Sequence, residues 1–423
     1  MKKFLTATAL SAACLWSASA LASGYQLNEY SVTNLGRSFA GAGVVGDDYS
    51  AIAYNPAGMT LKKSGLQASF TMAEVAADVR GQSPDSLGKK TDMDFGVPLP
   101  AAFGQYQIND KWFVGGGVYA PYGLATRYKK DSFVADSARE STLEVIDYNL
   151  SAAYKMNSQW SFGASFIARY IYGKMTSNIS GAASGLPNNI GKSEFELDGW
   201  TYTGTLGVMY SPSENTRIGL SYKPKSVQRV KGDHTVTINA PYNALPPLAN
   251  WSGVYSDGKA SPDLPETVLL SAYHKPFEKT AFTGSVRFTR WGDSFEKFSM
   301  TSSFTQTNNL PAVKYNWKDS WTISAGTEHY LNDNWTLRFG TAWDQSPSRD
   351  NRYRTHRIPD SDRIWISAGL SYRYENMQFD VGYAHLFMKK SFIRDSQNPR
   401  YNDHSSKYEA YSNMYGLGFQ YNF

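Results

Sequence analysis

The last nine residues of the chain, 415–423, alternate between apolar side chains and small or polar ones. The apolar members are Tyr415, Leu417, Phe419, Tyr421 and Phe423. Because successive side chains of a strand point to opposite faces, this pattern predicts a strand with one apolar and one polar face. The alternative is an edge strand of a soluble sheet, but an exposed aromatic end would promote aggregation there.

The alternation recurs from about residue 65 onward, and two kinds of connection separate the alternating segments. Six are short and rich in turn-forming residues: 108–111, 156–159, 211–215, 275–278, 331–334 and 374–376. Seven are long and polar: 81–91, 121–140, 174–197, 224–264, 292–314, 345–361 and 389–408. Short turns on one side and long loops on the other are typical of bacterial outer-membrane barrels. We therefore predict an all-β fold, a 14-stranded antiparallel transmembrane β-barrel over 65–423, rather than a soluble two-sheet sandwich.

The first 22 residues have the pattern of an export signal. Lys2 and Lys3 precede an apolar run that ends near Trp16, and small residues follow up to Ala22, so we predict a signal peptide over 1–22. The run is shorter than the ~20 residues of a spanning helix, which argues against the alternative of a membrane anchor. Cys14 is the only cysteine and lies inside the signal, so the mature chain is expected to lack thiol chemistry.

Composition excludes several functional classes. The mean hydropathy is −0.45 and no later apolar run reaches helix-spanning length, which excludes a helical membrane protein. The net charge of +5 falls to +3 without Lys2 and Lys3, so no nucleic-acid partner is expected. Gly-x-Ser-x-Gly and His-Glu-x-x-His are absent, and no two histidines have metal-ligand spacing. We expect no enzyme, no catalytic or metal site and no cofactor; the alternative is a hidden Ser/His/Asp set of an outer-membrane hydrolase.

Residues 23–64 do not alternate and are rich in Gly, Ala, Ser and Asn. Asn55, Pro56 and Ala57 form a helix start, with Asn as the cap and Pro at the first helical position. A barrel of fourteen strands encloses a lumen wider than its side chains fill. We therefore predict that 23–64 is a hatch of short helices inside the lumen. A disordered periplasmic tail is the alternative, against which apolar residues such as Leu35 argue.

Two blocks of sequence resemble the FadL/TodX family of outer-membrane transporters for hydrophobic compounds. The first comprises Ser23-Gly24-Tyr25-Gln26-Leu27-Asn28-Glu29-Tyr30, Leu35-Gly36-Arg37, Asp47-Asp48 and Asn55-Pro56-Ala57. The second comprises Asp333-Asn334-Trp335-Thr336-Leu337-Arg338 and Arg357-Ile358-Pro359-Asp360-Ser361-Asp362-Arg363-Ile364-Trp365-Ile366-Ser367-Ala368-Gly369. The resemblance runs over essentially the whole mature chain.

The resemblance implies a transport route. Ligand is captured at the extracellular loops, passes to a lumenal pocket and is released when the N-terminus of the hatch shifts. Exit is sideways, through a gap beside a kinked strand. The gating residues are expected among Ser23, Gly24, Tyr25, Asn55, Pro56 and Ala57. We expect long-chain fatty acids as ligands, with neutral aromatic hydrocarbons, or a passive porin or surface-binding protein, as alternatives.

Basic residues in such a lumen are expected to receive the carboxylate. The resemblance implies Arg363, because its position matches one of the family's basic residues, and a second cation near residues 170–174, where Arg169 and Lys174 are candidates. A buried carboxylate needs a cation or hydrogen-bond donors, and an arginine grips it with two parallel bonds. The alternative for Arg363 is a rim arginine paired with Asp360 or Asp362.

The long polar segment 224–264 holds apolar residues that an extracellular loop would expose, among them Leu248, Trp251 and Tyr255. Exposed apolar surface is unfavourable unless it binds something, so we predict a first capture site here. The alternative is a loop packed on its neighbours. The expected partners are hydrophobic small molecules, outer-membrane lipid and lipopolysaccharide, and the barrel assembly machinery, through the strand ending at Phe423. We expect a monomer with periplasmic termini.

Overall fold

The structure is a computed structural model, and it describes residues 24–84, 86–246, 248–304, 310, 312–394 and 404–423. The predicted signal peptide, Cys14 and Ser23 lie outside the described residues. Among those described, no helix is both long and apolar enough to cross a membrane.

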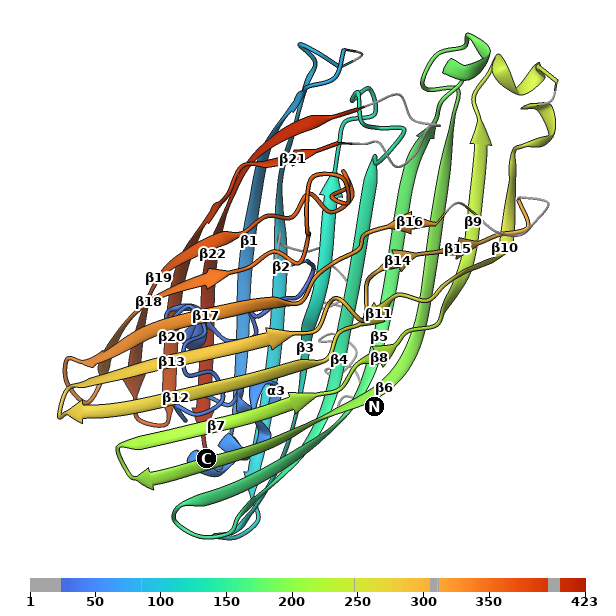
Figure 1. Cartoon of the computed structure of the whole chain (residues 1–423). Helices are drawn as coiled ribbons and strands as arrows, with labels where there is room; N and C mark the ends of the chain where they lie inside the picture. Colours follow the sequence, from blue (N-terminus) through green and yellow to red (C-terminus); the bar gives the residue numbers. More distant parts are fainter. Residues whose placement is uncertain (1–23, 85, 247, 305–309, 311, 395–403) are drawn as a thin grey trace.

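Fourteen antiparallel strands close into a barrel, as predicted (Figure 1). Strand β1 pairs with β22 from Gly65 opposite Asn422, which closes the ring. The strands, with their continuations, are β1 (Gly65–Gly81), β2 (Lys90–Gln107), β3 (Trp112–Arg127), β4 (Glu140–Lys155), β5 (Trp160–Ile179), β6 (Gly191–Ser213), β7 (Thr216–Lys223) with β9 (Val230–Ile238), β10 (Gly253–Ala260) with β12 (Thr267–Phe277), β13 (Thr280–Thr289), β17 (Ser320–Tyr330), β18 (Trp335–Asp344), β19 (Arg363–Tyr374), β20 (Met377–Met388) with β21 (Ser391–Ile393), and β22 (Ser406–Asn422).

The segment 224–264 is more regular than the predicted loop. It holds β9 and β10, which pair with each other and carry the sheet beyond the main body of the barrel (Figure 1). The sequence Thr235-Val236-Thr237-Ile238 still alternates, so its backbone continues the ladder although the segment is polar overall. Smaller elements of the connections are β8 (Ser226–Val227), β11 (Asp263–Leu264), β14 (Lys297–Phe298), β15 (Met300–Thr301), β16 (Val313–Lys314), η2 (Ala182–Ser184), η3 (Tyr242–Ala244) and η4 (Leu248–Asn250).

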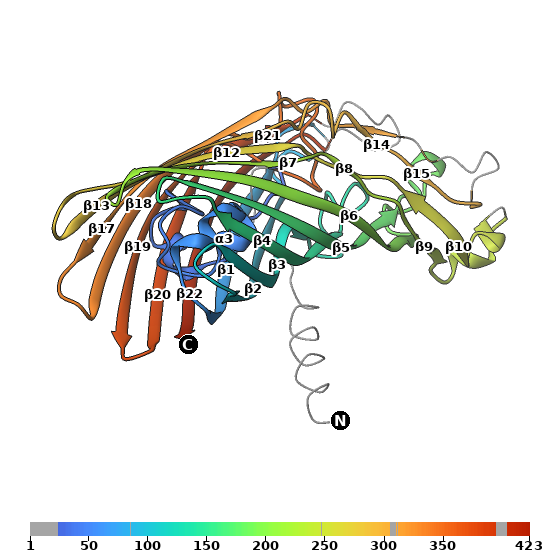
Figure 2. The ribbon, with the colours of Figure 1, turned by 90° about the horizontal axis from the view of Figure 1, so that it is seen from below.

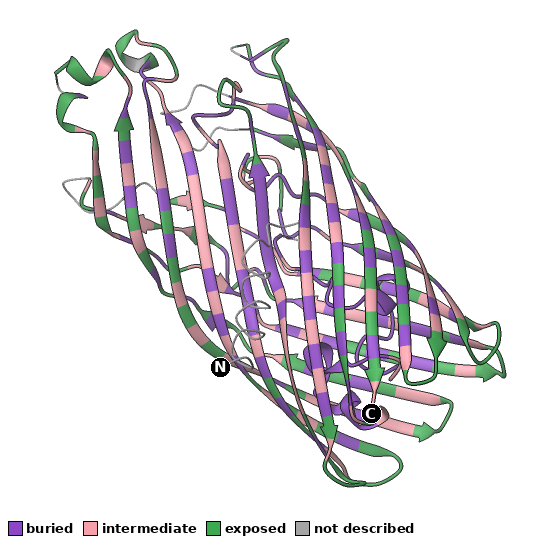
Figure 3. Ribbon diagram, turned by 180° about the vertical axis from the view of Figure 1, so that it is seen from behind, coloured by how far each residue is buried: buried purple, intermediate pink, exposed green. Residues whose placement is uncertain are grey.

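The barrel strands expose apolar side chains and bury polar ones, the reverse of a soluble protein. In β22, Leu417 is 63% exposed, whereas Gln420 is buried. In β1, Leu66 and Phe70 are exposed and Gln67 and Thr71 are buried. Figure 3 shows exposed and buried residues alternating along the strands. An apolar outer face and a polar interior are what a barrel in lipid requires.

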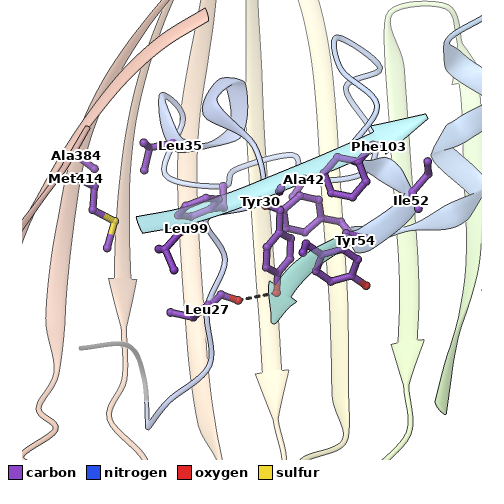
Figure 4. Packing of buried hydrophobic residues seen from close by; sticks show 14 of the residues in the cluster. Leu27, Tyr30, Leu35, Ala42, Ile52, Tyr54, Leu99, Phe103, Ala384 and Met414 are labelled. Carbon is purple, nitrogen blue, oxygen red and sulfur yellow. Dashed lines mark hydrogen bonds between the residues drawn. The ribbon is translucent and has the colours of Figure 1, made fainter. Parts of the chain in front are cut away.

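Residues 24–64 lie inside the barrel, toward the end where the short turns are (Figure 2). This hatch contains α2 (Val32–Leu35), α3 (Ala51–Tyr54) and the 3-10 helix η1 (Pro56–Leu61). The expected cap at Asn55 is confirmed, since its side chain accepts a bond from the Ala57 backbone N–H at 3.1 Å. Hatch residues such as Tyr30 pack with barrel residues such as Phe103 in one buried cluster (Figure 4).

Lumen-facing glycines let the hatch backbone approach the barrel wall. A Cβ on Gly340 of β18 would overlap the backbone of Arg37, and one on Gly207 of β6 would overlap the Asn55 side chain. A buried side chain at either position would push the hatch away from its strand. The hatch is therefore fitted to this barrel and is not loosely held in it.

Buried charged residues join the hatch to strands β17 and β18 of the barrel wall. Arg37 contacts Asp47 of the hatch at 2.6 Å and also Glu328 of β17. Arg338 of β18 bridges the same two carboxylates, at 3.0 Å to Asp47 and 2.8 Å to Glu328. Removing one member of a buried ion pair typically costs ~3–5 kcal/mol, because it leaves an uncompensated charge. The network therefore holds the body of the hatch in place.

Candidate ligand-binding cavity

Strand β3 is irregular where the hatch meets it. Its register with β4 shifts between Tyr119 and Tyr122, on either side of Pro121, which has no backbone N–H to donate. Its pairing with β2 covers only Phe113–Val118, although both strands run on beyond that point. The start of the hatch occupies this edge: Leu27 donates to the Pro121 carbonyl, and Gly123 donates to the Tyr25 carbonyl.

A cavity lies between this edge, the extracellular ends of β4–β6 and the long connections. Its volume is about 80 Å³, whereas pockets for drug-sized ligands measure about 300–1,000 Å³, so a long ligand fits only if the lining side chains move. The lining residues are Tyr25, Leu124, Ser141, Thr142, Leu143, Ile171, Gly173, Met175, Leu197, Val230, Ala260, Pro262, Phe295, Phe298, Tyr315, Arg357 and Ile358.

The Tyr25 ring closes the hatch side of the cavity, and other aromatic rings surround it. Its centroid lies 4.7 Å from that of Trp291, 5.5 Å from Phe295 and 5.6 Å from Trp317. Tyr122 of β3 contacts it edge-on at 6.1 Å. Tyr25 is thus a hatch residue that forms part of the cavity wall, and any movement of the hatch start changes the shape of the cavity.

Arg357 lines the cavity from the loop between β18 and β19. Its Nη1 donates to the Glu140 carbonyl at 3.1 Å and to the Ser141 hydroxyl at 3.0 Å. The hydroxyl of Thr126 in turn donates to the Arg357 carbonyl at 3.3 Å. The arginine is therefore held against the extracellular ends of β3 and β4.

Arg363 lies at the start of β19 and does not line this cavity. It is buried in an ion pair with Asp360 at 2.7 Å and a second with Asp344 at 3.2 Å. Asp360 also accepts a bond from the Gly24 backbone N–H at 3.1 Å. The pairing with Asp360 is the alternative that the sequence left open, and it connects Arg363 to the first described residue of the hatch.

The two candidate cations on β5 face opposite ways. Arg169 faces the lumen, where it is buried in a bidentate pair with Asp147 at 2.6 and 2.9 Å. Lys174 shares the parity of the exposed Phe166 and pairs with Glu194 of β6 at 3.3 Å. Its neighbour Gly173, and not Lys174, lines the cavity.

The predicted capture residues lie on and around the hairpin of β9 and β10. Leu248 is buried with Ile190 and Ile238, as the alternative of a packed loop implies. Trp251 and Tyr255 contact the ring of Phe304 at 5.9 and 5.5 Å. At the base of the same hairpin, Val230 and Ala260 line the cavity. One element therefore joins an aromatic cluster near its tip to the cavity below.

The sequence missed Arg357 and the aromatic rings around Tyr25 as parts of the cavity. Nothing in the chain distinguishes Arg357 from the other arginines of its loop, because its place at the cavity depends on the fold. The aromatic density of the connection after β13, with Trp291, Phe295, Tyr315 and Trp317, was a usable signal for an apolar site.

The chain matches a family model described as outer membrane protein transport protein (OMPP1/FadL/TodX) over residues 13–423. It is 28% identical over 454 residues to the long-chain fatty acid transport protein of Escherichia coli (strain K12), covering 100% of this chain and 99% of that one. It is 30% identical over 438 residues to the 47 kDa outer membrane protein of Pasteurella multocida (strain Pm70), again covering 100% and 99%.

Solved structures share the fold. A Pseudomonas aeruginosa FadL homologue superposes with a TM-score of 0.84 at 22% identity, covering 95% of this chain and all of that one (100%). The Pseudomonas putida toluene transporter TodX superposes with a TM-score of 0.70 at 18% identity, with 95% and 100% coverage. Since the family model spans residues 13–423 and the barrel is closed, the chain belongs to the FadL/TodX family of outer-membrane transporters for hydrophobic compounds.

Proposed function

We propose that this transporter takes up long-chain fatty acids, binds them in the cavity beside Tyr25 and releases them when the start of the hatch moves. The observation that carries the proposal is an apolar cavity with a guanidinium, that of Arg357, in its wall. Each buried methylene contributes ~0.8 kcal/mol, so an acyl chain binds strongly through its tail. The relatives named long-chain fatty acid transport proteins support this ligand.

Capture begins, in this proposal, at the β9–β10 hairpin. Trp251 and Tyr255 offer aromatic surface near its tip, and Val230 and Ala260 continue the apolar path to the cavity. Leu248 supports the tip from below through its packing with Ile238. An apolar ligand would gain at each step from leaving water.

Release would follow from movement of the hatch start, which includes Ser23, outside the described residues, together with Gly24 and Tyr25. Tyr25 accepts one backbone bond from Gly123, its hydroxyl donates to the Asp263 carbonyl at 3.5 Å, and its ring makes aromatic contacts. The helix start at Asn55, Pro56 and Ala57 supports the hatch from below.

The proposed exit is sideways, where the pairing of β2 with β3 stops at Val118. An open groove of about 920 Å³ on the lipid-facing surface lies beside this point, and Ala102, Gly116 and Val118 are among the residues that line it. Small side chains on the adjoining strands leave room for an apolar ligand to enter lipid there.

A neutral aromatic ligand is the second candidate, because the rings around Tyr25 favour flat apolar molecules. Retention of labelled oleate and labelled toluene by the purified barrel separates the two, and we expect oleate to be retained. Toluene retention without oleate would overturn the fatty-acid proposal. A large steady conductance in a planar bilayer would indicate a porin instead.

We also propose that the barrel functions as a monomer in contact with outer-membrane lipid and lipopolysaccharide. Phe423, 66% exposed at the end of β22, is the proposed contact for the assembly machinery. The carboxylate role that the resemblance implies for Arg363, Arg169 and Lys174 is not tested by the structure, and the comparison of acid and ester in the Discussion tests it for Arg363.

A further inference from the structure

The outward face of three neighbouring strands carries a row of cations near its extracellular end. In β1, Arg80 lies directly opposite Lys407 of β22 on one side and Lys90 of β2 on the other. Arg80 has the same parity along β1 as the exposed Leu66 and Phe70, so it points away from the lumen. Residues directly opposite one another on adjacent strands share a face, so Lys90 and Lys407 point outward too. We call Arg80, Lys90 and Lys407 the cation row.

The cation row is electrostatically unfavourable in the chain by itself. Like charges directly opposite one another on adjacent strands destabilise a sheet. Lys407 has a compensating carboxylate, that of Glu409 at 2.6 Å. Neither Arg80 nor Lys90 forms a salt bridge with another residue in the described part of the chain. An anion from outside the chain would therefore remove the repulsion.

A row of carboxylates lies one outward position closer to the membrane. Asp78 of β1 is directly opposite Glu409 of β22 and Asp92 of β2. Lys129 contacts Asp92 at 2.7 Å. Lys390 contacts Glu409 at 3.2 Å. The two outer carboxylates are thus matched by lysines, and the two rows together with these lysines carry a net positive charge.

The cation row lies beyond the apolar band that faces the lipid. Arg80 follows Leu66, at the periplasmic start of this band, by 14 positions of β1. A strand rises ~3.3 Å per residue and a barrel strand is tilted by ~40°, so the two residues differ by about 35 Å in height. The band itself is ~25 Å tall, which places Arg80 about 10 Å above the hydrocarbon, in the region of the lipid head groups.

Aromatic side chains at the top of the apolar band lie on the same outward face. Tyr411 of β22 and Phe387 of β20 are opposite one another, and both are exposed. Phe392 of β21, opposite Lys407, is exposed as well. This face therefore presents aromatic surface to the acyl chains of a lipid and cations to its head group.

The extracellular end of the barrel is not cationic all round. On the outward face of β5 and β6, Lys174 and Lys192 both contact Glu194, at 3.3 and 3.2 Å. Glu196 and Asp198 are exposed on the same face of β6. The lysines of that sector are matched within the chain, in contrast to the cation row.

We propose that the outward face of β22, β1 and β2, three strands that run side by side (Figure 1), is a binding site for lipopolysaccharide, in which the cation row binds phosphates of the sugar head group. Arginine binds a phosphate through two parallel bonds, and lysine supplies a point charge. Clustered Lys and Arg side chains at a membrane surface attract anionic head groups. The inference rests on the lipopolysaccharide contact proposed above and names its site.

The spacing of the cation row favours this lipid over one with a single phosphate. Neighbouring strands lie ~4.8 Å apart, so the row from Lys407 to Lys90 is about 10 Å long. A head group that carries two phosphates can contact more than one cation of the row at once. The exposed Tyr411 and Phe387 contact its acyl chains.

The test measures binding of fluorescent diphosphoryl lipid A to the purified, folded full-length barrel in detergent micelles, with monophosphoryl lipid A and phosphatidylglycerol as comparison lipids. The variant Arg80→Gln/Lys90→Gln keeps two long side chains and removes two charges. The matched control, Lys231→Gln/Lys259→Gln, removes two exposed charges that lie opposite each other on β9 and β10, where Asp198 is also opposite Lys231. Heat-dependent gel mobility confirms folding of each variant.

We expect Arg80→Gln/Lys90→Gln to bind diphosphoryl lipid A about ten- to thirtyfold more weakly, since each cation near a membrane surface contributes about a fivefold factor. The exchange Arg80→Lys/Lys90→Arg keeps both charges and should retain most of the affinity. The wild-type barrel should bind diphosphoryl lipid A more tightly than either comparison lipid. Oleate retention should be the same in all variants, because the changed residues do not line the cavity.

Unchanged affinity for lipid A in Arg80→Gln/Lys90→Gln would overturn the inference. An equal loss in the control variant would also overturn it, because the attraction would then depend on net charge alone. Equal affinity for phosphatidylglycerol and lipid A would assign the face to anionic lipids in general and not to lipopolysaccharide. A wild-type barrel that binds no lipid A would contradict the proposed lipopolysaccharide contact itself, whereas oleate retention tests the fatty-acid proposal separately.

Discussion

The side-chain amide of Asn55, in the hatch, donates to the backbone carbonyl of Val208 in β6 at 3.2 Å. The same side chain caps the η1 helix by accepting from the Ala57 N–H, so one residue both starts a helix and joins the hatch to the barrel. Gly207 leaves the space that the Asn55 side chain occupies. Asn55 therefore anchors the hatch to the barrel wall and also caps the η1 helix.

Deleting Asn55–Ala57 should leave a folded barrel and reduce oleate uptake several-fold. All barrel strands begin at Gly65 or later, so their pairing does not need the deleted residues, whereas the hatch loses its contact with β6. Uptake by expressing cells measures the effect, with gel mobility as the check on folding. Unchanged uptake would exclude a gating role for this part of the hatch.

Arg363→Ala should lower the stability of the barrel by ~3–5 kcal/mol, because Asp344 and Asp360 would stay buried without their cation. Since Arg363 does not line the cavity, we expect the variant to lose affinity for oleate and for methyl oleate by the same factor. Urea unfolding and the two binding constants measure this. A loss confined to oleate would instead support Arg363 as the carboxylate receptor.

A disulfide between Ser38→Cys and Ser367→Cys should form readily and leave transport intact. The two hydroxyls lie 2.7 Å apart, one in the hatch and one in β19, and the mature chain is predicted to contain no other cysteine. The charge network already fixes this part of the hatch, so transport should need movement only of its first residues. Oleate uptake with and without reductant measures the effect, and recovery of lost uptake by reductant would show that the whole hatch moves.

The extracellular loops should loosen in acid through His356. Its imidazole bonds to Ser406 at 2.9 Å and Ser137 at 3.3 Å, and burial lowers its pKa to about 3. In a detached loop its pKa is ~6.5, so its contribution to loop stability is complete above pH 6.5 and is lost as the pH falls toward 3.

Proteolysis of the loops between pH 7 and pH 4, with a protease active across that range, tests this expectation. His356→Gln keeps a hydrogen-bonding side chain and should flatten the pH dependence. The same slope in wild type and variant would show that the effect does not come from His356.

The strand order was predictable because apolar and polar residues alternate along most barrel strands, and many strands end at a turn that the sequence shows. Trp160, directly after a short Asn-containing turn, begins β5, and Gly65 begins β1. The extension of β9 and β10 beyond the barrel was not predicted, since polar residues in water are compatible with a loop or a ladder. Pairing with β6 decides between them, and that pairing is a property of the folded sheet.

The site was less predictable, because it depends on which residues distant in sequence become neighbours. Asp344, the second partner of Arg363, lies on the strand before it and carries no signal of that role. Lys174 was a candidate through its position near a family residue, but its parity in β5 turns it outward. Arg357 lines the cavity only because the fold positions its loop there, and the sequence alone does not show that position.

The fit between the hatch and the wall has a consequence for the order of biogenesis. Val32 and Leu35 of the hatch lie against Gly382 in β20 and Gly416 in β22, the strands made last. Once β22 joins β1, these contacts are enclosed by a continuous ring of backbone bonds. The hatch is synthesised before every barrel strand, so it must already lie in the lumen when the last strands pair. The barrel is therefore expected to close around a hatch that is already in place.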